Sequence, residues 1–203
     1  MISIDTKKKE WLGNFHRAGT TFTAETVETF DHDFGSAGQG KLMPHGLYDL
    51  VHHHAHLHLN TSHDTSAWWC DSVALWWEHA GRAAHPQAKR LLVLGDGGGS
   101  TSATQYLCKE DLQGLANRLG LEIRMAHYPP YCSKYNPIEP HVFPHITRAC
   151  QGVIFHTVDI AATMHRTGAH RDWSTSDSTA PGHGVPNGAS LHCRFQTQDE
   201  NCL

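Results

Sequence analysis

Three acidic residues stand at the ends of predicted elements in widely separated parts of the chain. Asp96 closely follows the aliphatic run 91–94 and precedes three glycines. Such a run, bounded by charge and glycine, is typical of a buried strand, and open α/β sheets place their sites at the carboxyl ends of strands. Asp5 lies on a predicted strand at the start of the chain, and Glu139 follows an Asn-Pro turn. Three carboxylates with no obvious cationic partners indicate a divalent-metal site.

A site of this kind could catalyse displacement at a phosphodiester. Two divalent ions about 4 Å apart clamp the attacking and leaving oxygens of that reaction, and Mg²⁺ and Mn²⁺ prefer oxygen ligands. One central aspartate would bridge both ions, and the other two acids would hold one each. The nucleophile would be water or a DNA 3′-hydroxyl, and glycines 97–99 would let a nucleic-acid backbone approach Asp96. Taken alone, Asp96 is more simply interpreted as a loop acid that caps the next helix.

Composition narrows the class of protein. The chain has 203 residues, a formal net charge of −4 and six cysteines without a Cys-x-x-Cys pair. These features predict one domain, or one domain with a tail, in a reducing cytosol rather than a zinc ribbon or a disulfide scaffold. No stretch resembles a signal peptide or a membrane helix. The negative net charge does not indicate nucleic-acid binding. Such binding would have to come from local basic patches, such as residues 7–9 or 89–90.

The hydrophobic pattern predicts an alternation of strands and helices. We expect strands near residues 1–5, 11–15, 46–60, 90–96 and 121–127, and helices near 67–79, 102–119 and from about 138 onward. The order β-β-β-α-β-α-β-α, with acids on the first strand, on the strand after the first helix and at the start of the last helix, is that of the α/β RNase H-like fold. This predicts a mixed five-stranded sheet flanked by helices.

The end of the chain has a different composition. From about Thr163 it is rich in Ser, Thr, Gly and His and lacks apolar periodicity. Such segments rarely bury enough surface to offset the entropy of ordering. We therefore expect a catalytic domain over residues 1–160 and a divergent, poorly ordered tail over residues 161–203.

Several motifs together resemble a known family, the DDE transposases of the ISAzo13 group of bacterial insertion sequences. The resemblance runs from the first residue to about Val158. It rests on residues 3–10 with 13–15, on 31–34, 46–49, 63–65 and 76–77, on Asp96-Gly97-Gly98-Gly99-Ser100, and on His127-Tyr128-Pro129-Pro130 through Ser133-Lys134 to Asn136-Pro137-Ile138-Glu139. The Asn-Pro-Ile-Glu element is also similar to the neighbouring IS630 and mariner transposases.

This resemblance implies a function and a set of site residues. Asp5, Asp96 and Glu139 would be the catalytic residues and the ligands of two Mg²⁺ ions, for which Mn²⁺ could substitute. The substrate would be transposon-end and target DNA, cut and joined by an enzyme that is a homo-oligomer when active. The protein would be cytoplasmic and associated with the bacterial nucleoid. Lysines and aromatics near the acids would contact DNA: Lys7, Lys8, Lys9, Tyr131, Lys134 and Tyr135.

The sequence also departs from that family. The relatives are longer and carry an N-terminal DNA-binding region, whereas this chain starts at the first predicted catalytic strand. The part after about Asp159 does not resemble them, and a frameshift or truncation would explain such a tail. Pro140 follows Glu139 directly, which a helix tolerates in its first turn. An alternative function is therefore a truncated, non-catalytic remnant that only binds DNA or full-length transposase.

Histidines suggest another alternative, a histidine-rich zinc hydrolase that uses His54 and His56. On one strand, His52, His54, His56 and His58 would share a face. Zinc sites, however, normally draw ligands from several segments, so we favour the polar face of an exposed strand. Asp31 and Asp33 are interpreted as loop acids and Asp64 as a helix N-cap. Tryptophans 68, 69, 76 and 77 are expected in the core.

Overall fold

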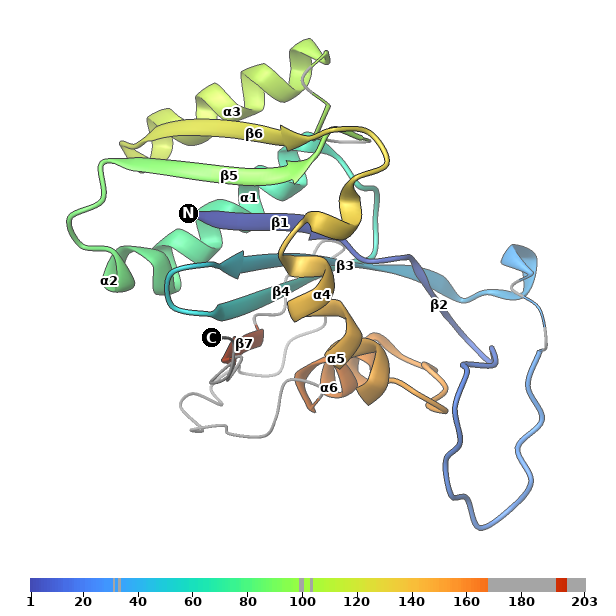
Figure 1. The fold of residues 1–203 in the computed structure, drawn as a ribbon. Coiled ribbons are helices and arrows are strands. Elements are labelled where there is room, and N and C mark those ends of the chain that lie inside the picture. Colours follow the sequence, from blue (N-terminus) through green and yellow to red (C-terminus); the bar gives the residue numbers. More distant parts are fainter. Residues whose placement is uncertain (31, 33, 99–100, 103, 168–192, 197–203) are drawn as a thin grey trace.

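The chain folds around a single mixed β-sheet flanked by helices (Figure 1). The computed structural model describes all residues except 31, 33, 99–100, 103, 168–192 and 197–203. Six strands follow one another in the order β6-β5-β1-β3-β4-β7, and β2 pairs with β3 outside this path. The strands are β1 (Ile2–Thr6), β2 (Glu10–Leu12), β3 (Gly40–Asp49), β4 (His54–Asn60), β5 (Arg90–Asp96), β6 (Glu122–Tyr128) and β7 (Cys193–Gln196).

Helices connect and cover these strands. They are α1 (Ser66–Trp76), the π-helical turn η2 (Trp77–Gly81), α2 (Arg82–Ala84), α3 (Tyr106–Leu119), α4 (Ile138–His141), α5 (Phe143–Ala149) and α6 (Val158–Thr167), with short 3₁₀ turns η1 (Gly35–Ala37) and η4 (Ser133–Tyr135). Thr65 is the N-cap of α1, since its hydroxyl accepts a hydrogen bond from the Trp68 N–H at 3.3 Å. The prediction of Asp64 as the cap was therefore wrong by one residue. None of the described helices is long and apolar enough to cross a membrane.

Strand direction determines where the site can form. β1 runs parallel to β5, and β5 runs parallel to β6. Each parallel connection passes through a helix, as such crossovers require. The carboxyl ends of β1, β5 and β6 therefore meet at one edge of the sheet, on the right in Figure 1. β3 is antiparallel to β1 and forms a hairpin with β4, so the hairpin turn lies at the opposite edge.

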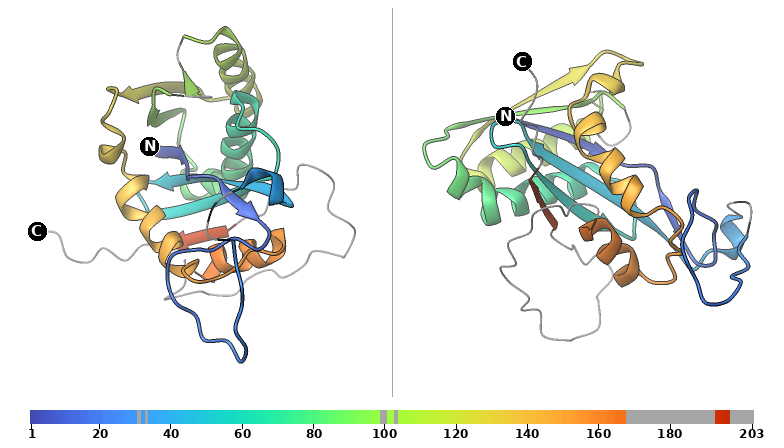
Figure 2. Two further views of the ribbon diagram at one scale, coloured as in Figure 1. Left: turned by 90° about the vertical axis from the view of Figure 1, so that its right-hand side faces the viewer. Right: turned by 60° about the horizontal axis from the view of Figure 1, so that its bottom comes forward.

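Two hydrophobic clusters fix the sheet between its helices, which Figure 2 shows on opposite faces. One cluster joins Ile2 and Ile4 of β1 to α1 and α3, with Trp69 and Trp76 almost completely buried. The other joins β3 and β4 to α4, α5 and α6 and includes Ile138. The expectation that the tryptophans belong to the core is confirmed for Trp69, Trp76 and Trp77, which are at most 4% exposed.

The RNase H-like fold is confirmed, with differences in detail. The segment 46–60, predicted as one strand, is the β3–β4 hairpin with a turn at 50–53, and β3 begins earlier, at Gly40. β4 is not exposed as predicted, because His56 is 6% exposed and His58 is fully buried. β4 lies inside the sheet, between β3 and β7, and its residues Ala55, Leu57 and Leu59 are buried in the second hydrophobic cluster. The sheet has seven strands rather than five, because the single strand predicted over 46–60 is two strands, β3 and β4, and because β7 joins the sheet.

The predicted boundary at residue 160 falls inside α6. Ala161 and Ala162 of that helix are buried in the second hydrophobic cluster. Farther on, β7 pairs antiparallel with β4. The folded unit therefore continues past the predicted boundary. The rest of the predicted tail, residues 168–192 and 197–203, lies outside the described residues, as do Asp31, Asp33, Gly99 and Ser100.

Candidate active site

Asp5 and Asp96 lie side by side because their strands are parallel and in register. Ile2 pairs with Val93 and Ser3 with Leu94, so the same register places Asp5 beside Asp96 two residues farther on. Both residues stand at the carboxyl ends of their strands. In agreement with this placement, the charge of Asp96 raises the pKa of Asp5. The structure thus places Asp5 and Asp96 close together, as the sequence predicts.

Glu139 reaches the same edge from the first turn of α4. The preceding residue, Ile138, is fully buried and packs over Gly46, which is the β3 partner of Asp5. A Cβ at Gly46 would lie 2.5 Å from the Ile138 Cδ1 and 3.0 Å from the Phe143 Cε1. The absence of a side chain at this position therefore lets α4 sit close to the sheet, with its acid beside Asp5. The Glu139 carboxyl lies close enough to Asp5 to raise the pKa of that aspartate.

A buried Ser3–Asn136 pair ties the loop before α4 to β1. The Ser3 hydroxyl donates to the Asn136 Oδ1 at 2.5 Å and accepts from the Ile138 N–H at 3.1 Å. The Asn136 Nδ2 donates to the carbonyl of Ile4 at 3.0 Å and lies 3.4 Å from the Asp5 Oδ2. Both side chains are fully buried. Sequence reasoning missed this positioning role; the one available signal was a serine between two buried isoleucines.

The electrostatic state of Asp5 is unusual for an aspartate. Its pKa rises from 3.8 to about 7, firstly because the carboxyl is buried and then because Asp96 and Glu139 are close. The backbone N–H of Thr6 donates to the Asp5 Oδ1 at 2.7 Å and acts in the opposite direction. No basic side chain is among the groups that shift this pKa. Three clustered acids without a balancing base are the donor set that a divalent cation fits.

The loop after Asp96 folds back on this strand end. The Thr101 hydroxyl lies 2.7 Å from the backbone carbonyl of Asp96 and 2.9 Å from that of Gly98. A ring nitrogen of His127, Nε2, is 2.8 Å from the carbonyl oxygen of Thr101. Asp96 does not cap the following helix, because Gln105 is the N-cap residue of α3. The simpler interpretation of Asp96 as a capping acid is therefore wrong.

The residues expected to contact DNA differ in their availability. Lys7 is only 13% exposed, and its ammonium lies 2.5 Å from a Glu10 carboxylate oxygen. Its charge is balanced within the protein, so the structure argues against the predicted DNA contact there. Lys8, Lys9, Tyr131, Lys134 and Tyr135 are all exposed. Tyr131 is fully exposed and has a φ of 64°, and the ammonium of Lys134 lies 5.1 Å from the ring centroid of Tyr135.

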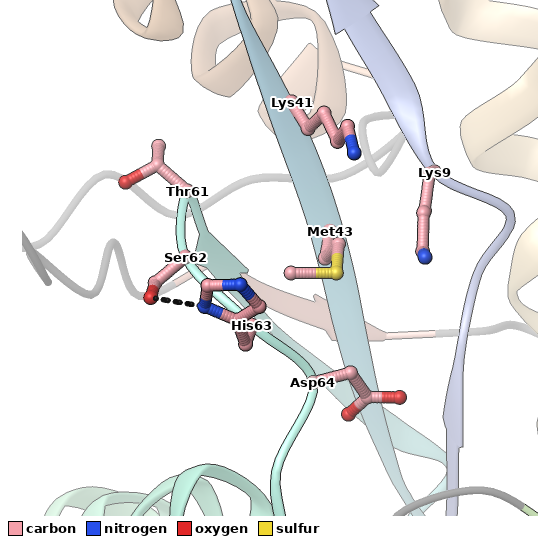
Figure 3. A pocket seen from close by; sticks show the side chains of 7 residues that line it. All are labelled: Lys9, Lys41, Met43, Thr61, Ser62, His63 and Asp64. Carbon is pink, nitrogen blue, oxygen red and sulfur yellow. Dashed lines mark hydrogen bonds between the residues drawn. The ribbon is translucent and has the colours of Figure 1, made fainter.

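A hollow in the surface near Lys9 is lined by a second lysine, Lys41. It has a volume of about 580 Å³, and Lys9, from the connection before β2, and Lys41, from β3, approach it while Asp64 closes its other end (Figure 3). Thr61, Ser62 and His63 form its wall. In Figure 3 the two ammonium groups point into the same open space. This arrangement suits an anionic group better than an apolar ligand.

His54 and His56, the two predicted zinc ligands, do not join a cluster of potential ligand atoms among the described residues. Within the described ranges, two groups bring three potential ligand atoms within 4.8 Å of one another: Glu10 with Cys150 and His165, and Asp49 with His52 and His85. His54 and His56 belong to neither group, and His56 is buried in β4. The zinc-hydrolase alternative based on these two residues therefore has no structural support.

Comparison with known proteins supplies the family. The model of the family described as the Rhodopirellula transposase DDE domain matches residues 1–194. The chain belongs to this family. The match continues well past Asp159, where the resemblance was expected to end, so the interpretation of the later residues as unlike the family was wrong. No curated protein matches this DDE-domain chain.

Solved transposases share its fold. The "Mos1 transposase paired-end complex with left transposon end" has a TM-score of 0.52 and 14% identity, over 80% of this chain and 45% of the other. The "mariner Mos1 paired end complex with Mg" has a TM-score of 0.55 and 15% identity, over 80% and 45%. The "Mos1 Strand Transfer Complex" has a TM-score of 0.52 and 17% identity, over 84% and 47%. This DDE-domain chain thus spans less than half the length of the transposases it matches.

Proposed function

We propose that this DDE domain cleaves and joins DNA strands at insertion-sequence ends by two-metal phosphoryl transfer. The observation that carries the proposal is the meeting of Asp5, Asp96 and Glu139, from three separate elements, with no basic side chain among the described groups that shift the pKa of Asp5. In this proposal these three residues are both the catalytic residues and the metal ligands. The carbonyl-anchored Asn136 and the buried Ser3 would keep the acids at fixed positions.

The proposed cofactor is a pair of Mg²⁺ ions, with Mn²⁺ as a substitute. The Mos1 complexes that share this fold include one with Mn and one with Mg. When bound, such ions would stabilise the charge that develops on the attacking and leaving oxygens. A cation beside Asp5 would favour its ionised form, against the burial and the neighbouring acids that raise its pKa.

The proposed substrate is duplex DNA at the right-hand edge of the sheet in Figure 1. Gly97 and Gly98 are exposed beside Asp96 and would allow the sugar-phosphate backbone to approach. Lys8, Lys9 and Lys134 would neutralise phosphates, and Tyr131 and Tyr135 could stack on displaced bases. Transposon ends, target DNA and a second copy of the chain are the proposed partners of the active enzyme.

Nicking of supercoiled plasmid in Mn²⁺ tests the proposal. The parent chain should nick the plasmid, and Asp96→Asn should not. Asp71→Asn is the matched control, since Asp71 is an exposed acid on α1 that pairs with Arg118 far from the proposed site. Equal nicking by the parent and Asp96→Asn would overturn the proposal. A folded but silent parent chain would favour the alternative of a non-catalytic remnant that only binds DNA or full-length transposase.

A further inference from the structure

A second cluster of metal-binding side chains lies at the opposite edge of the sheet from the three acids. Asp49 ends β3 and pairs with Ile2, at the start of β1, whereas Asp5 is near the end of that strand. His52 belongs to the turn of the β3–β4 hairpin, and His85 follows directly after α2. In Figure 1 this hairpin turn and α2 lie together on the left. The β3–β4 hairpin thus contributes two side chains, and the end of α2 contributes the third.

The side chains converge on one carboxylate oxygen. The Asp49 Oδ2 lies 3.0 Å from the His52 Nδ1 and 2.7 Å from the His85 Nε2. The other oxygen, Oδ1, accepts a hydrogen bond from the Val51 N–H at 3.0 Å, which fixes the orientation of the carboxylate. Burial alone would raise the pKa of Asp49, but the hydrogen bonds from His52, His85 and Val51 outweigh it and lower this pKa. Asp49 is therefore an anion with two imidazoles aimed at it.

We propose that Asp49, His52 and His85 bind one Zn²⁺ ion, with water as the fourth ligand. Zn²⁺ takes imidazole nitrogen and carboxylate oxygen at about 2.0–2.2 Å in a tetrahedron, which separates neighbouring ligand atoms by roughly 3.4 Å. The present distances of 3.0 and 2.7 Å would need to open by about 0.4 and about 0.7 Å to reach this separation. The side chain of His52 is 39% exposed, which gives water and the ion a path to the site.

The donor set favours zinc over the ions proposed for the catalytic acids. Two imidazoles suit Zn²⁺ and related transition metals, whereas Mg²⁺ prefers oxygen alone. Binding would displace the protons through which the rings now bond to Asp49. The two histidine rings already lie close together, with centroids 4.6 Å apart. To admit the ion, both rings would move slightly away from the Asp49 carboxylate.

The other cluster, Glu10 with Cys150 and His165, does not support the same inference. Glu10 is already paired with Lys7, and its second oxygen lies 3.7 Å from Arg17. Burial raises the pKa of the Cys150 thiol to about 12, so the thiolate that zinc requires is costly there. The negative charge of that cluster is balanced by side chains, whereas Asp49 is contacted by two titratable imidazoles.

The consequence of zinc binding at Asp49 would be structural. The ion would link the β3–β4 hairpin to the end of α2, two parts of the chain that lie far apart in the sequence. An ion that binds the folded chain and not the unfolded one raises its stability by mass action. Because the site and the three acids lie at opposite ends of β1, zinc bound here would not contact the DNA-cleaving groups.

Zinc titration of the full chain tests the proposal, by calorimetry and by thermal unfolding, in excess Mg²⁺ to occupy the oxygen-only site. One equivalent should bind and raise the Tm. His52→Ala should weaken binding by more than the ~10–100-fold that loss of an outer-shell partner costs, and His85→Ala should do the same. His145→Ala, at an exposed histidine on α5, is the control for incidental binding to the other histidines.

His52 lies in an exposed turn, so its alanine variant keeps the fold and isolates the ligand effect. Loss of the zinc-induced rise in Tm in His52→Ala, with the rise kept in His145→Ala, is the expected result. The proposal is overturned if the parent binds no stoichiometric zinc, or if His52→Ala binds it as tightly as the parent. Neither outcome affects the proposed activity, which rests on residues at the other edge.

Discussion

Replacing Asp5 by asparagine should stabilise the protein, and the gain should grow with pH. The pKa of Asp5 is about 7 in the folded chain against 3.8 ordinarily, through burial first and then through Asp96 and Glu139. Between those values the folded state holds a proton that the unfolded state has released. The stability of the parent therefore falls as the pH rises through this window, by about 1.4 kcal/mol for each pH unit.

The size of the gain follows from this shift. By about pH 8 the cost of ionising Asp5 in the folded chain approaches ~4 kcal/mol. An asparagine carries no charge, and its oxygen can still accept the Thr6 N–H. Part of the cost stays, because a buried amide is also desolvated. We therefore expect Asp5→Asn to gain ~1–3 kcal/mol at that pH, which for a chain of this length is a rise in Tm of several degrees.

Urea unfolding in EDTA at about pH 5.5 and about pH 8 measures this gain. Asp71→Asn is again the control, and its stability should stay within ~0.5 kcal/mol of the parent at both pH values. The reasoning is refuted if Asp5→Asn is less stable than the parent at the higher pH. It is also refuted if the difference between the two proteins does not widen with pH, since the gain would then not come from ionisation of Asp5.

Two further substitutions, Asn136→Ala and Gly46→Ala, probe the positioning of the site, and a third, Glu10→Gln, probes a buried ion pair outside it. Asn136→Ala should lower the free energy of unfolding in urea by ~1–3 kcal/mol, because the buried Ser3 hydroxyl loses the oxygen to which it donates. It should also reduce plasmid nicking under conditions in which the variant remains folded. Gly46→Ala should cost ~1–3 kcal/mol by pushing against Ile138, while Gly114→Ala, with open space around it, should be neutral or stabilising in the same assay. Glu10→Gln should destabilise the protein by ~2–3 kcal/mol at neutral pH, because His165 and Lys7 outweigh burial and hold the pKa of Glu10 at about 2. This loss should be full above about pH 4.5 and vanish as the pH falls through about 2, as acid unfolding would show; an equal loss at all pH values would contradict it.

Local patterns were enough to predict the part of the site that depends on strand ends. The apolar run before Asp96 and the alternation around Asp5 each indicate a strand, and parallel strands bring their ends together without further information. Glu139 follows from the Asn-Pro turn and the helix after it. The position of α4 over the sheet also depends on Gly46, and nothing in the local sequence connects that glycine with Ile138.

Contacts between distant segments could not be predicted. Ser3 and Asn136 are 133 positions apart, and neither side chain is unusual in its own segment. The alternating histidines continue across the β3–β4 turn, so periodicity did not show where one strand ends and the next begins. The pairing of β4 with β7 depends on residues whose composition suggested a tail. The lysine run after Asp5 looked uniform, yet Lys7 alone is bound by Glu10.

The measurement that tests the central claim most directly is the number of protons released when Mg²⁺ binds. Because the pKa of Asp5 is about 7, about half a proton per chain should leave at neutral pH, and almost none above about pH 8.5. Titration calorimetry in two buffers with different ionisation enthalpies gives this number, and Asp5→Asn should bind Mg²⁺ weakly with no proton release. Tight Mg²⁺ binding that releases no proton at neutral pH, or that persists in Asp5→Asn, would show that the three acids do not form the metal site.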